Sequence, residues 1–498
     1  MKINIKKMDP LKCKTPVFVI ALFKGEKKLS GIAAKLNNLV EGKIEELLKS
    51  GEISGKYKEF TFIHTHKSDI KRVLIMGLGE KEKFESDMLR SVMAIAARNV
   101  RRIRCKSISI LDFSYIGIDS KLASELVIEG MQLGLHKFNK YLGDRRNMYL
   151  DEVNYITETD NEEEILKGCN EGMILSDATI FCRDLVNEPA NVLHPGSFTE
   201  IIKQMAKEKN IEFEVFDKKK LQKMGMNLIL AVGNASVNEP KMVILKYRSK
   251  KAKKHVGLIG KGVTFDSGGY QVKGGDIMLR MNGDMGGAAA VVAAMQAVAE
   301  QKLPVNVTAM IPMVENLING EGYKPNDIIK SYSGKTVEIL HTDAEGRLIL
   351  ADAITYMTEQ GVDCMVDIAT LTGGCIVSLG HQMSGVFGTD QSIVDKLKNA
   401  GETSSELLWQ LPIHDDYLPL LSSDVADLSN TGGRAASAIG AAMFLREFTN
   451  GIPWAHLDIA GTAVMDKQIF FYYKRPYNPK EGATGVGTRL LYHFLKKF

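Results

Sequence analysis

The chain has 498 residues, of which 45% are hydrophobic and 25% are charged, and its formal net charge is +4. This length allows two or three domains with a large core, and the composition is that of an ordinary globular protein. So small a net charge does not favour nucleic-acid binding. Two local lysine runs, at 218–220 and 250–254, are typical of solvated surface.

The six cysteines are scattered and form no Cys-x-x-Cys pair, which predicts unpaired thiols in a reducing compartment. The apolar run VFVIALF at 17–23 follows a proline, precedes KGEKK and has no small-residue cleavage site. A buried strand is therefore the better prediction than a signal peptide. No segment has the length of a membrane span, so we expect a cytoplasmic protein that does not bind membranes.

In the first third, short apolar runs alternate with amphipathic segments. The predicted strands are 17–22, 60–63, 72–76 and 107–111, and the predicted helices are 36–49, 87–100 and 120–133. The acidic stretch ETDNEEE at 158–164 looks like a boundary. We therefore expect an N-terminal domain at 1–160, a connecting helix at 161–185 and a catalytic domain at 186–498.

In the second half, strands are predicted at 212–216, 241–247, 255–259, 305–311, 366–369 and 455–458. Strands that alternate with helices indicate an α/β fold of two domains: a smaller N-terminal α/β domain and a larger catalytic one with a mostly parallel central sheet. The small-residue stretch MGGAAAVV at 285–292 predicts a helix that lies close against the sheet. This close approach would explain why positions 286 and 287 are glycine.

The most informative segment is TDAEGRL at 342–348, which follows the β-branched run KTVEIL. On an extended backbone Asp343, Glu345 and Arg347 would point the same way, and His341 would share that side. Two acids and a guanidinium would then converge at a strand end. By itself this pattern fits either a salt-bridged turn or a site for a metal and an anion.

A second cluster, KGVTFDSGG at 261–269, opens a glycine loop after a short apolar run; Lys273 and Asp284 follow it. Asp266 alone would be a turn residue, and Asp284 alone a helix N-cap. Together with Asp343 and Glu345 they are too many negative charges to gather without cations, and divalent ions accept such oxygen ligands. The carboxyl ends of the parallel strands are the expected place for this cluster.

These two clusters resemble those of the leucyl aminopeptidase family, the cytosolic, hexameric type with two metal ions. The resemblance covers roughly residues 171–498 and includes RDLVNEPAN at 183–191, ATLTG at 369–373 and WAHLDIAGT at 454–462. In the first third only the general outline matches, best at VLIMGLG, residues 73–79.

The resemblance implies two divalent ions per subunit, Mn²⁺ or Zn²⁺, with Mg²⁺ or Co²⁺ as alternatives. One ion would be held by Lys261, Asp266, Asp284 and Glu345, and the other by Asp266, Asp343 and Glu345. A lysine can coordinate only as the neutral amine, a form that nearby dications favour.

The resemblance also implies roles in catalysis and in substrate binding. Lys273 would stabilise the oxyanion, and Arg347 would hold a bicarbonate that acts as the general base. Asp284 would help to receive the free α-amine of the substrate. The pocket for the first residue would be formed by Met281, Thr370, Leu371 and Gly373.

The implied activity is metal-dependent release of N-terminal amino acids, with Leu- and Met-like residues preferred and the dipeptide Cys-Gly as a further candidate substrate. The implied partners are peptides with a free N-terminus and further copies of the chain in a homohexamer. Two alternatives stay open: a two-metal phosphoesterase, which would also need clustered aspartates, and a DNA-binding regulator with residual peptidase activity. The absence of a basic anchor beyond Lys273 and Arg347 argues against the first.

The chain departs from the family pattern at three places. His341 stands where asparagine is usual, the segment 274–280 differs, and Ser437 occupies a position where glycine is common. None of these changes removes an implied ligand.

Overall fold

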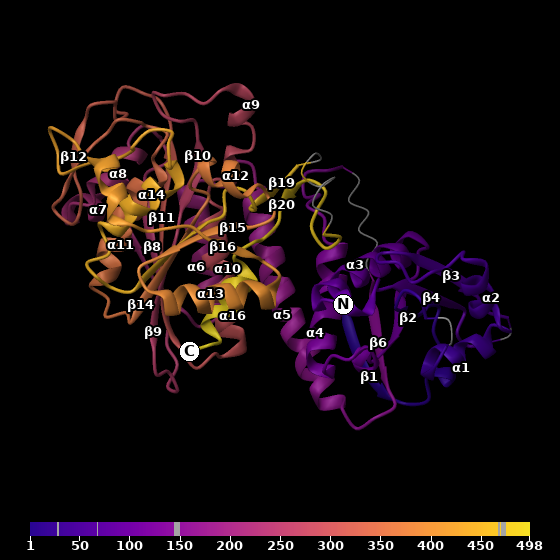
Figure 1. Cartoon of the computed structure of the whole chain (residues 1–498). Coiled ribbons are helices and arrows are strands. Elements are labelled where there is room, and N and C mark those ends of the chain that lie inside the picture. The colour runs from indigo at the N-terminus through magenta and orange to yellow at the C-terminus, as the bar shows by residue number, and fades with distance from the viewer. Residues whose placement is uncertain (27–28, 67, 144–149, 467–468, 470–474) are drawn as a thin grey trace. The chain divides into compact units, whose positions relative to one another are not determined.

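The computed structural model describes residues 1–26, 29–66, 68–143, 150–466, 469 and 475–498, and Figure 1 shows the whole chain. The chain divides into two compact units, residues 1–177 with 474–479, and residues 178–473 with 480–498. No sequence pattern indicated that residues 475–479 belong to the first unit. The 26-residue helix α5 (Glu162–Asn187) runs from the first unit into the second.

The first unit is built on a six-stranded sheet with the order β1-β6-β5-β2-β4-β3, parallel except for the β3–β4 pair. Its elements are β1 (Lys2–Lys7), η1 (Pro10–Lys12), β2 (Phe18–Leu22), α1 (Gly31–Leu39), α2 (Lys43–Ser50), β3 (Phe60–His64), β4 (Arg72–Gly77), η2 (Lys81–Lys83), α3 (Ser86–Arg102), β5 (Ser107–Leu111), η3 (Phe113–Ile116), α4 (Ser120–Leu135) and β6 (Glu152–Thr157). One face of the sheet packs against α3 and α4, and the other packs against α1 and α2. All five residues of β2 are buried, as its apolar run predicts.

Most of the elements predicted for this unit are confirmed, but β1 and β6 were not predicted. The single helix predicted at 36–49 is wrong, because the chain forms α1 and α2 instead. Between them Glu41 and Gly42 have φ angles of 54° and 85°, which a continuous right-handed helix cannot contain.

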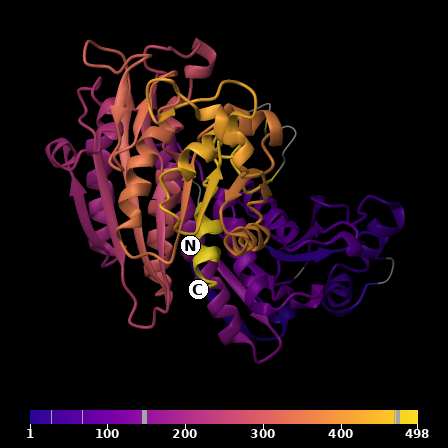
Figure 2. The ribbon, with the colours of Figure 1, turned by 60° about the vertical axis from the view of Figure 1, so that its left-hand side comes forward.

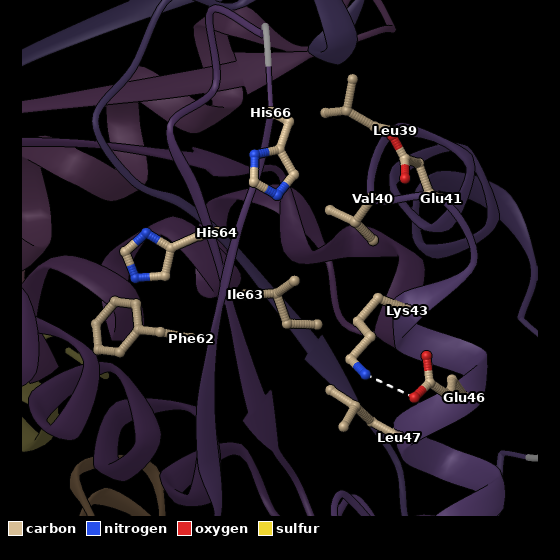
Figure 3. Close-up of a pocket in the computed structure, with 10 residues that line it drawn as sticks. All are labelled: Leu39, Val40, Glu41, Lys43, Glu46, Leu47, Phe62, Ile63, His64 and His66. Atoms are coloured by element: carbon tan, nitrogen blue, oxygen red, sulfur yellow. Dashed lines mark hydrogen bonds and ion pairs between the residues drawn. The ribbon is translucent and has the colours of Figure 1, made fainter.

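A pocket in this unit lies between α2 and the edge strand β3 (Figure 3). Its lining residues are Leu39, Val40, Glu41, Lys43, Glu46, Leu47, Phe62, Ile63, His64 and His66. The Lys43–Glu46 ion pair, 2.6 Å from Nζ to Oε1, is the one interaction drawn among them. Residues that the sequence predicts for the functional site do not line this pocket.

The second unit is built on a nine-stranded sheet with the order β16-β15-β18-β14-β9-β11-β8-β7, and β10 pairs with β11. Most neighbouring strands are parallel, as predicted. The strands are β7 (Glu212–Phe216), β8 (Lys241–Tyr247), β9 (His255–Gly260), β10 (Gly262–Asp266), β11 (Asn306–Asn316), β14 (Cys364–Ala369), β15 (Ser384–Gly388), β16 (Leu408–Gln410) and β18 (Trp454–Asp458). Two small sheets contain β12 (Ile328–Lys330), β13 (Thr336–Glu338) and β17 (Leu428–Ser429), and β19 (Val464–Met465) and β20 (Gly482–Ala483).

Helices cover both faces of this sheet (Figure 1, Figure 2). The helices of this unit are α6 (Pro195–Glu208), α7 (Lys218–Met224), α8 (Asn227–Gly233), α9 (Gly275–Met278), α10 (Gly286–Gln301), α11 (Gly346–Thr358), α12 (Gly373–Leu379), α13 (Gln391–Ser404), α14 (Ser437–Arg446) and α16 (Thr488–Leu495), with 3₁₀ turns η4 (Met281–Gly283) and η5 (Asp415–Leu421); the four-residue α9 has no buried residue and lies apart from the sheet. Helix α10 packs on β9, β11 and β14, while α8, α11 and α14 share the core of the other face. The sheet is therefore the middle of three layers.

The close approach predicted for α10 is confirmed at one of its two glycines. A Cβ on Gly287 would lie 2.0 Å from the carbonyl oxygen of Ile368 in β14, which leaves room only for glycine. A Cβ on Gly286 would meet its nearest atoms at 3.5 Å, an ordinary contact, so the explanation is wrong for Gly286.

All six cysteines are free, as predicted. Within the part of the chain that the structure describes, no helix is both long enough and apolar enough to cross a membrane.

Candidate metal centre

The carboxyl ends of parallel strands bring the predicted residues to one edge of the large sheet. Lys261 follows β9, Asp266 ends β10 and Thr370 follows β14. Strands β9 and β14 are parallel neighbours, and β10 runs parallel to β11 beside them. The expected location of the acidic cluster is thereby confirmed.

The segment 342–348 reaches this edge by a different path from the one predicted. Thr342 and Asp343 form a turn, Glu345 has helical angles (φ −79°, ψ −37°), and α11 begins at Gly346. The prediction of an extended segment is therefore wrong. The turn is fixed from outside, because the carbonyl of Thr342 accepts hydrogen bonds from Asn316 Nδ2 (3.1 Å) and from the hydroxyl of Tyr323.

His341 consequently does not share a strand face with Asp343. Its side chain is exposed, and its Nδ1 accepts a hydrogen bond from the backbone N–H of Asp343 at 3.2 Å. Its own carbonyl accepts a hydrogen bond from Asn430 Nδ2 at 2.7 Å. The imidazole therefore braces the turn that presents the Asp343 carboxylate.

Carboxylates and ammonium groups alternate in the cluster. Oxygen atoms of Asp266, Asp343 and Glu345 lie within 4.8 Å of one another. Lys273 Nζ lies 2.7 Å from Asp266 Oδ2 and 2.5 Å from Asp343 Oδ1. Lys261 Nζ lies 2.8 Å from both Asp284 Oδ2 and Glu345 Oε1. Four carboxylates thus share two ammonium groups.

The pKa shifts in the cluster follow from burial and from this excess of acids. Burial, reinforced by the charges of Glu345 and Asp284, raises the pKa of Asp266 well above its usual value. Burial also raises the pKa of Asp284, to about 7, although Lys261 opposes the shift. Burial alone would lower the pKa of Lys261, but Asp284, Glu345 and Asp266 outweigh it and raise it. The cluster therefore demands more positive charge than two lysines supply.

These residues fit divalent metal ions. Carboxylate oxygens are the ligands that such ions accept, and carboxylates shared between two ions suit a close pair. Lys261 carries its proton in the arrangement described here, and it could serve as a ligand only after losing that proton to become the neutral amine.

Arg347 has the properties of an anion site. It is buried in the first turn of α11, and its Nη1 donates to the carbonyl of Asn430 at 2.8 Å. Its Nε is buried and has no hydrogen-bond partner among the described residues. Burial lowers the pKa of Arg347 to about 10, so the guanidinium stays charged at neutral pH. A buried, charged guanidinium whose Nε lacks a hydrogen-bond partner among the described residues suits a small anion.

Of the predicted pocket residues, Thr370 makes direct contact with the cluster. Its carbonyl accepts a hydrogen bond from Lys261 Nζ (2.9 Å), and its Oγ1 donates to Asp284 Oδ1 (2.7 Å). The others lie on adjoining segments: Met281 opens η4, Leu371 follows Thr370, and Gly373 opens α12.

Sequence reasoning did not identify several residues that support the cluster. Asn316 Nδ2 donates to Asp266 Oδ1 at 2.8 Å, and Asp458 accepts hydrogen bonds from the loop that contains Thr370. Both are the last residues of buried strands, β11 and β18. A polar residue at the carboxyl end of an apolar strand was the available signal.

Comparisons with known proteins identify the family of the chain. The family model described as "Cytosol aminopeptidase family, catalytic domain" matches residues 180–492, and the one described as "Cytosol aminopeptidase family, N-terminal domain" matches residues 19–145. A "Probable cytosol aminopeptidase" of Alkaliphilus metalliredigens is 37% identical over 96% of both chains. One of Solibacter usitatus is 42% identical over 90% of this chain and 91% of its own.

Among solved structures, the chain is similar to "Bottromycin maturation enzyme BotP in complex with Mn". The TM-score is 0.84 and the sequence identity is 30%, over 97% of this chain and 99% of that one. A second structure of "Bottromycin maturation enzyme BotP" has a TM-score of 0.83 and 29% identity.

Proposed function

Because the chain belongs to the cytosol aminopeptidase family and is therefore a metal-dependent aminopeptidase, we propose that its active site is the cluster of four carboxylates and two lysines. The observation that carries this proposal is the buried excess of carboxylates at the carboxyl edge of the sheet. We propose Leu- and Met-like first residues as the preferred substrates, with Cys-Gly as a further one.

Two divalent ions would be held by residues of the cluster, in which carboxylates and ammonium groups are already paired. Lys261, Asp266, Asp284 and Glu345 would bind one, and Asp266, Asp343 and Glu345 the other. Mn²⁺ or Zn²⁺ are the proposed ions, with Mg²⁺ or Co²⁺ as alternatives, and the similar BotP structure is a complex with Mn. When bound, a pair of ions polarises the scissile carbonyl and activates water.

The residues of the chain then bind and orient the substrate. Asp284, held by the Thr370 hydroxyl, accepts the free α-amine and so restricts cleavage to the first residue. The ammonium of Lys273 donates to the oxygen that becomes negative in the transition state. Arg347 would hold a bicarbonate, which would supply a general base beside the site. Met281, Thr370, Leu371 and Gly373 form the wall of the first-residue pocket.

The test is turnover of a panel of aminoacyl arylamides, Cys-Gly and an aryl phosphate by the metal-loaded protein. We expect metal-dependent hydrolysis that favours leucyl and methionyl substrates and does not occur with N-acetyl-leucyl arylamide. Hydrolysis of the blocked substrate at an equal rate would contradict the role of Asp284. Turnover of the phosphate alone would favour the phosphoesterase alternative.

Bicarbonate provides an independent test of Arg347. We expect bicarbonate to stimulate the wild type, and we expect Arg347→Met to be slow and insensitive to it. Equal stimulation of both proteins would contradict an anion site at Arg347.

We also propose a cytoplasmic homohexamer, on the resemblance of the chain to the leucyl aminopeptidase family. Light scattering of the active protein tests the proposal, and a stable active monomer would contradict it.

A further inference from the structure

The loop between β14 and α12 is held by a buried carboxylate that has no part in the proposed chemistry. Asp458, the last residue of β18, is 0% exposed. Its Oδ1 accepts backbone hydrogen bonds from Leu371 (3.2 Å), Thr372 (3.5 Å) and Ala460 (3.1 Å). Its Oδ2 accepts a hydrogen bond from the side-chain hydroxyl of Thr372, with 2.7 Å between Oγ1 and Oδ2.

The register of the sheet explains why Asp458 reaches this loop. Strands β18 and β14 are parallel, and Asp458 is paired with Ala369, the last residue of β14. The loop therefore leaves the sheet beside the Asp458 carboxylate. Thr372 also accepts a hydrogen bond from the N–H of Cys375 at 3.0 Å, so its hydroxyl joins Asp458 to the start of α12.

The other end of the loop touches the proposed metal centre. The carbonyl of Thr370 accepts from Lys261 Nζ at 2.9 Å, and Thr370 Oγ1 donates to Asp284 Oδ1 at 2.7 Å. Asp458 thus lies one loop away from two residues that would bind the same ion. Hydrogen bonds to a charged acceptor are roughly twice as strong as neutral ones, so the carboxylate holds the loop firmly.

We propose that Asp458 is a positioning residue for the aminopeptidase reaction. Through residues 370–372 it sets where Asp284 and Lys261 stand, and therefore how tightly the site binds a divalent ion and how strictly the pocket selects the first residue. This inference rests on the proposed function, which assigns those two residues to the metal and the α-amine.

Asp352 in α11 offers a matched control. It is also 0% exposed, and it accepts three backbone hydrogen bonds, from Leu228 (2.9 Å), Ile229 (3.2 Å) and Tyr332 (2.8 Å). These bonds hold the start of α8 and the segment that follows β12, not the 370–372 loop. A substitution at Asp352 reports what the loss of a buried acceptor does to stability alone.

The experiment compares Asp458→Asn, Thr372→Val and Thr372→Ser with Asp352→Asn. Thr372→Val keeps the shape of the side chain and removes the hydroxyl, whereas Thr372→Ser keeps the hydroxyl. Three quantities are measured: Mn²⁺ affinity of the metal-free protein by calorimetry, the ratio of kcat/KM for leucyl and glycyl arylamides, and Tm.

We expect Asp458→Asn and Thr372→Val to weaken Mn²⁺ binding by about 10- to 100-fold, as loss of a residue that supports metal ligands typically does, and to reduce the leucyl preference. Thr372→Ser should resemble the wild type, and Asp352→Asn should change Tm alone. If the first two variants change Tm and leave Mn²⁺ affinity and selectivity intact, Asp458 is structural only and the inference is overturned.

The calorimetric measurement separates this inference from the proposed function. If the wild type hydrolysed none of the arylamides, the substrate proposal would fail, and the Mn²⁺ titrations would still decide whether Asp458 positions the metal-binding residues.

Discussion

Substitution of Gly346 by alanine should disable the site and leave the fold intact. A Cβ at this position would lie 2.7 Å from Lys261 Cε and 2.8 Å from Lys261 Nζ. Ordinary contact begins at 3.4 Å, so the end of the lysine must retreat by about 0.7 Å. Since a misplacement of about 1 Å can cost 10²-fold in rate, we expect kcat/KM to fall by about 10- to 100-fold.

The fold should tolerate this change because the obstructing atoms are the end of a flexible side chain. Alanine is also the better residue for a helix by about 1 kcal/mol, and Gly346 opens α11. The assay is kcat/KM for leucyl arylamide alongside Tm. Gly440→Ala is the matched control, since Gly440 lies inside α14 and a Cβ there would meet no atom within 4 Å.

A contrasting variant shows what a structural clash would do. In Gly287→Ala the new Cβ would lie 2.0 Å from the backbone oxygen of Ile368, so we expect a large loss of stability. Wild-type kcat/KM in Gly346→Ala would refute the reasoning. The reasoning would also be refuted if Gly346→Ala lost activity together with a fall in Tm as large as that of Gly287→Ala, because the loss would then reflect unfolding.

Three further predictions concern the cluster and the strand behind it. Lys273→Met should lower kcat by about 10²- to 10³-fold with little change in KM, because it removes the proposed donor to the oxyanion, and steady-state kinetics test this. Removal of metal by a chelator should abolish turnover, and Mn²⁺ should restore it and stabilise the fold by about 2.7 kcal/mol at 100 times its Kd, as measured by thermal unfolding. The third concerns His456: burial alone would lower its pKa, but Asp367, 2.6 Å from Nδ1, raises it above 6.5. The contribution of the His456–Asp367 pair to the free energy of unfolding is therefore complete below about pH 6.5 and is lost as the pH rises through the folded-state pKa of His456. In Asp367→Asn the free energy of unfolding should depend less on pH in that range.

The residues proposed as ligands stand out in the sequence because their chemistry is unusual. Three aspartates and a glutamate near strand ends require cations, and the structure brings Asp266, Asp343 and Glu345 together. The residues that support them carry no such mark. Asn316 and Asp458 are the last residues of the mostly apolar strands β11 and β18, and only the register of the sheet shows what they touch. A polar residue at a strand end marks a position near the site, but the contacts of that residue depend on pairing between distant strands and cannot be read from the sequence around it.

The sequence marked segment 342–348 as part of a candidate site but did not predict its local structure. The pattern Asp-x-Glu-x-Arg can bring its two acids together either on an extended strand or in a turn that enters a helix. The residue types therefore did not distinguish these two backbone conformations. The choice is made by distant groups, since Asn316 and Tyr323 hold the carbonyl of Thr342 and end the extended run. Gly346 then allows α11 to start against the Lys261 side chain, where any Cβ would intrude. The backbone conformation thus depends on contacts with residues far away in the sequence, which the residue types of the segment itself do not show.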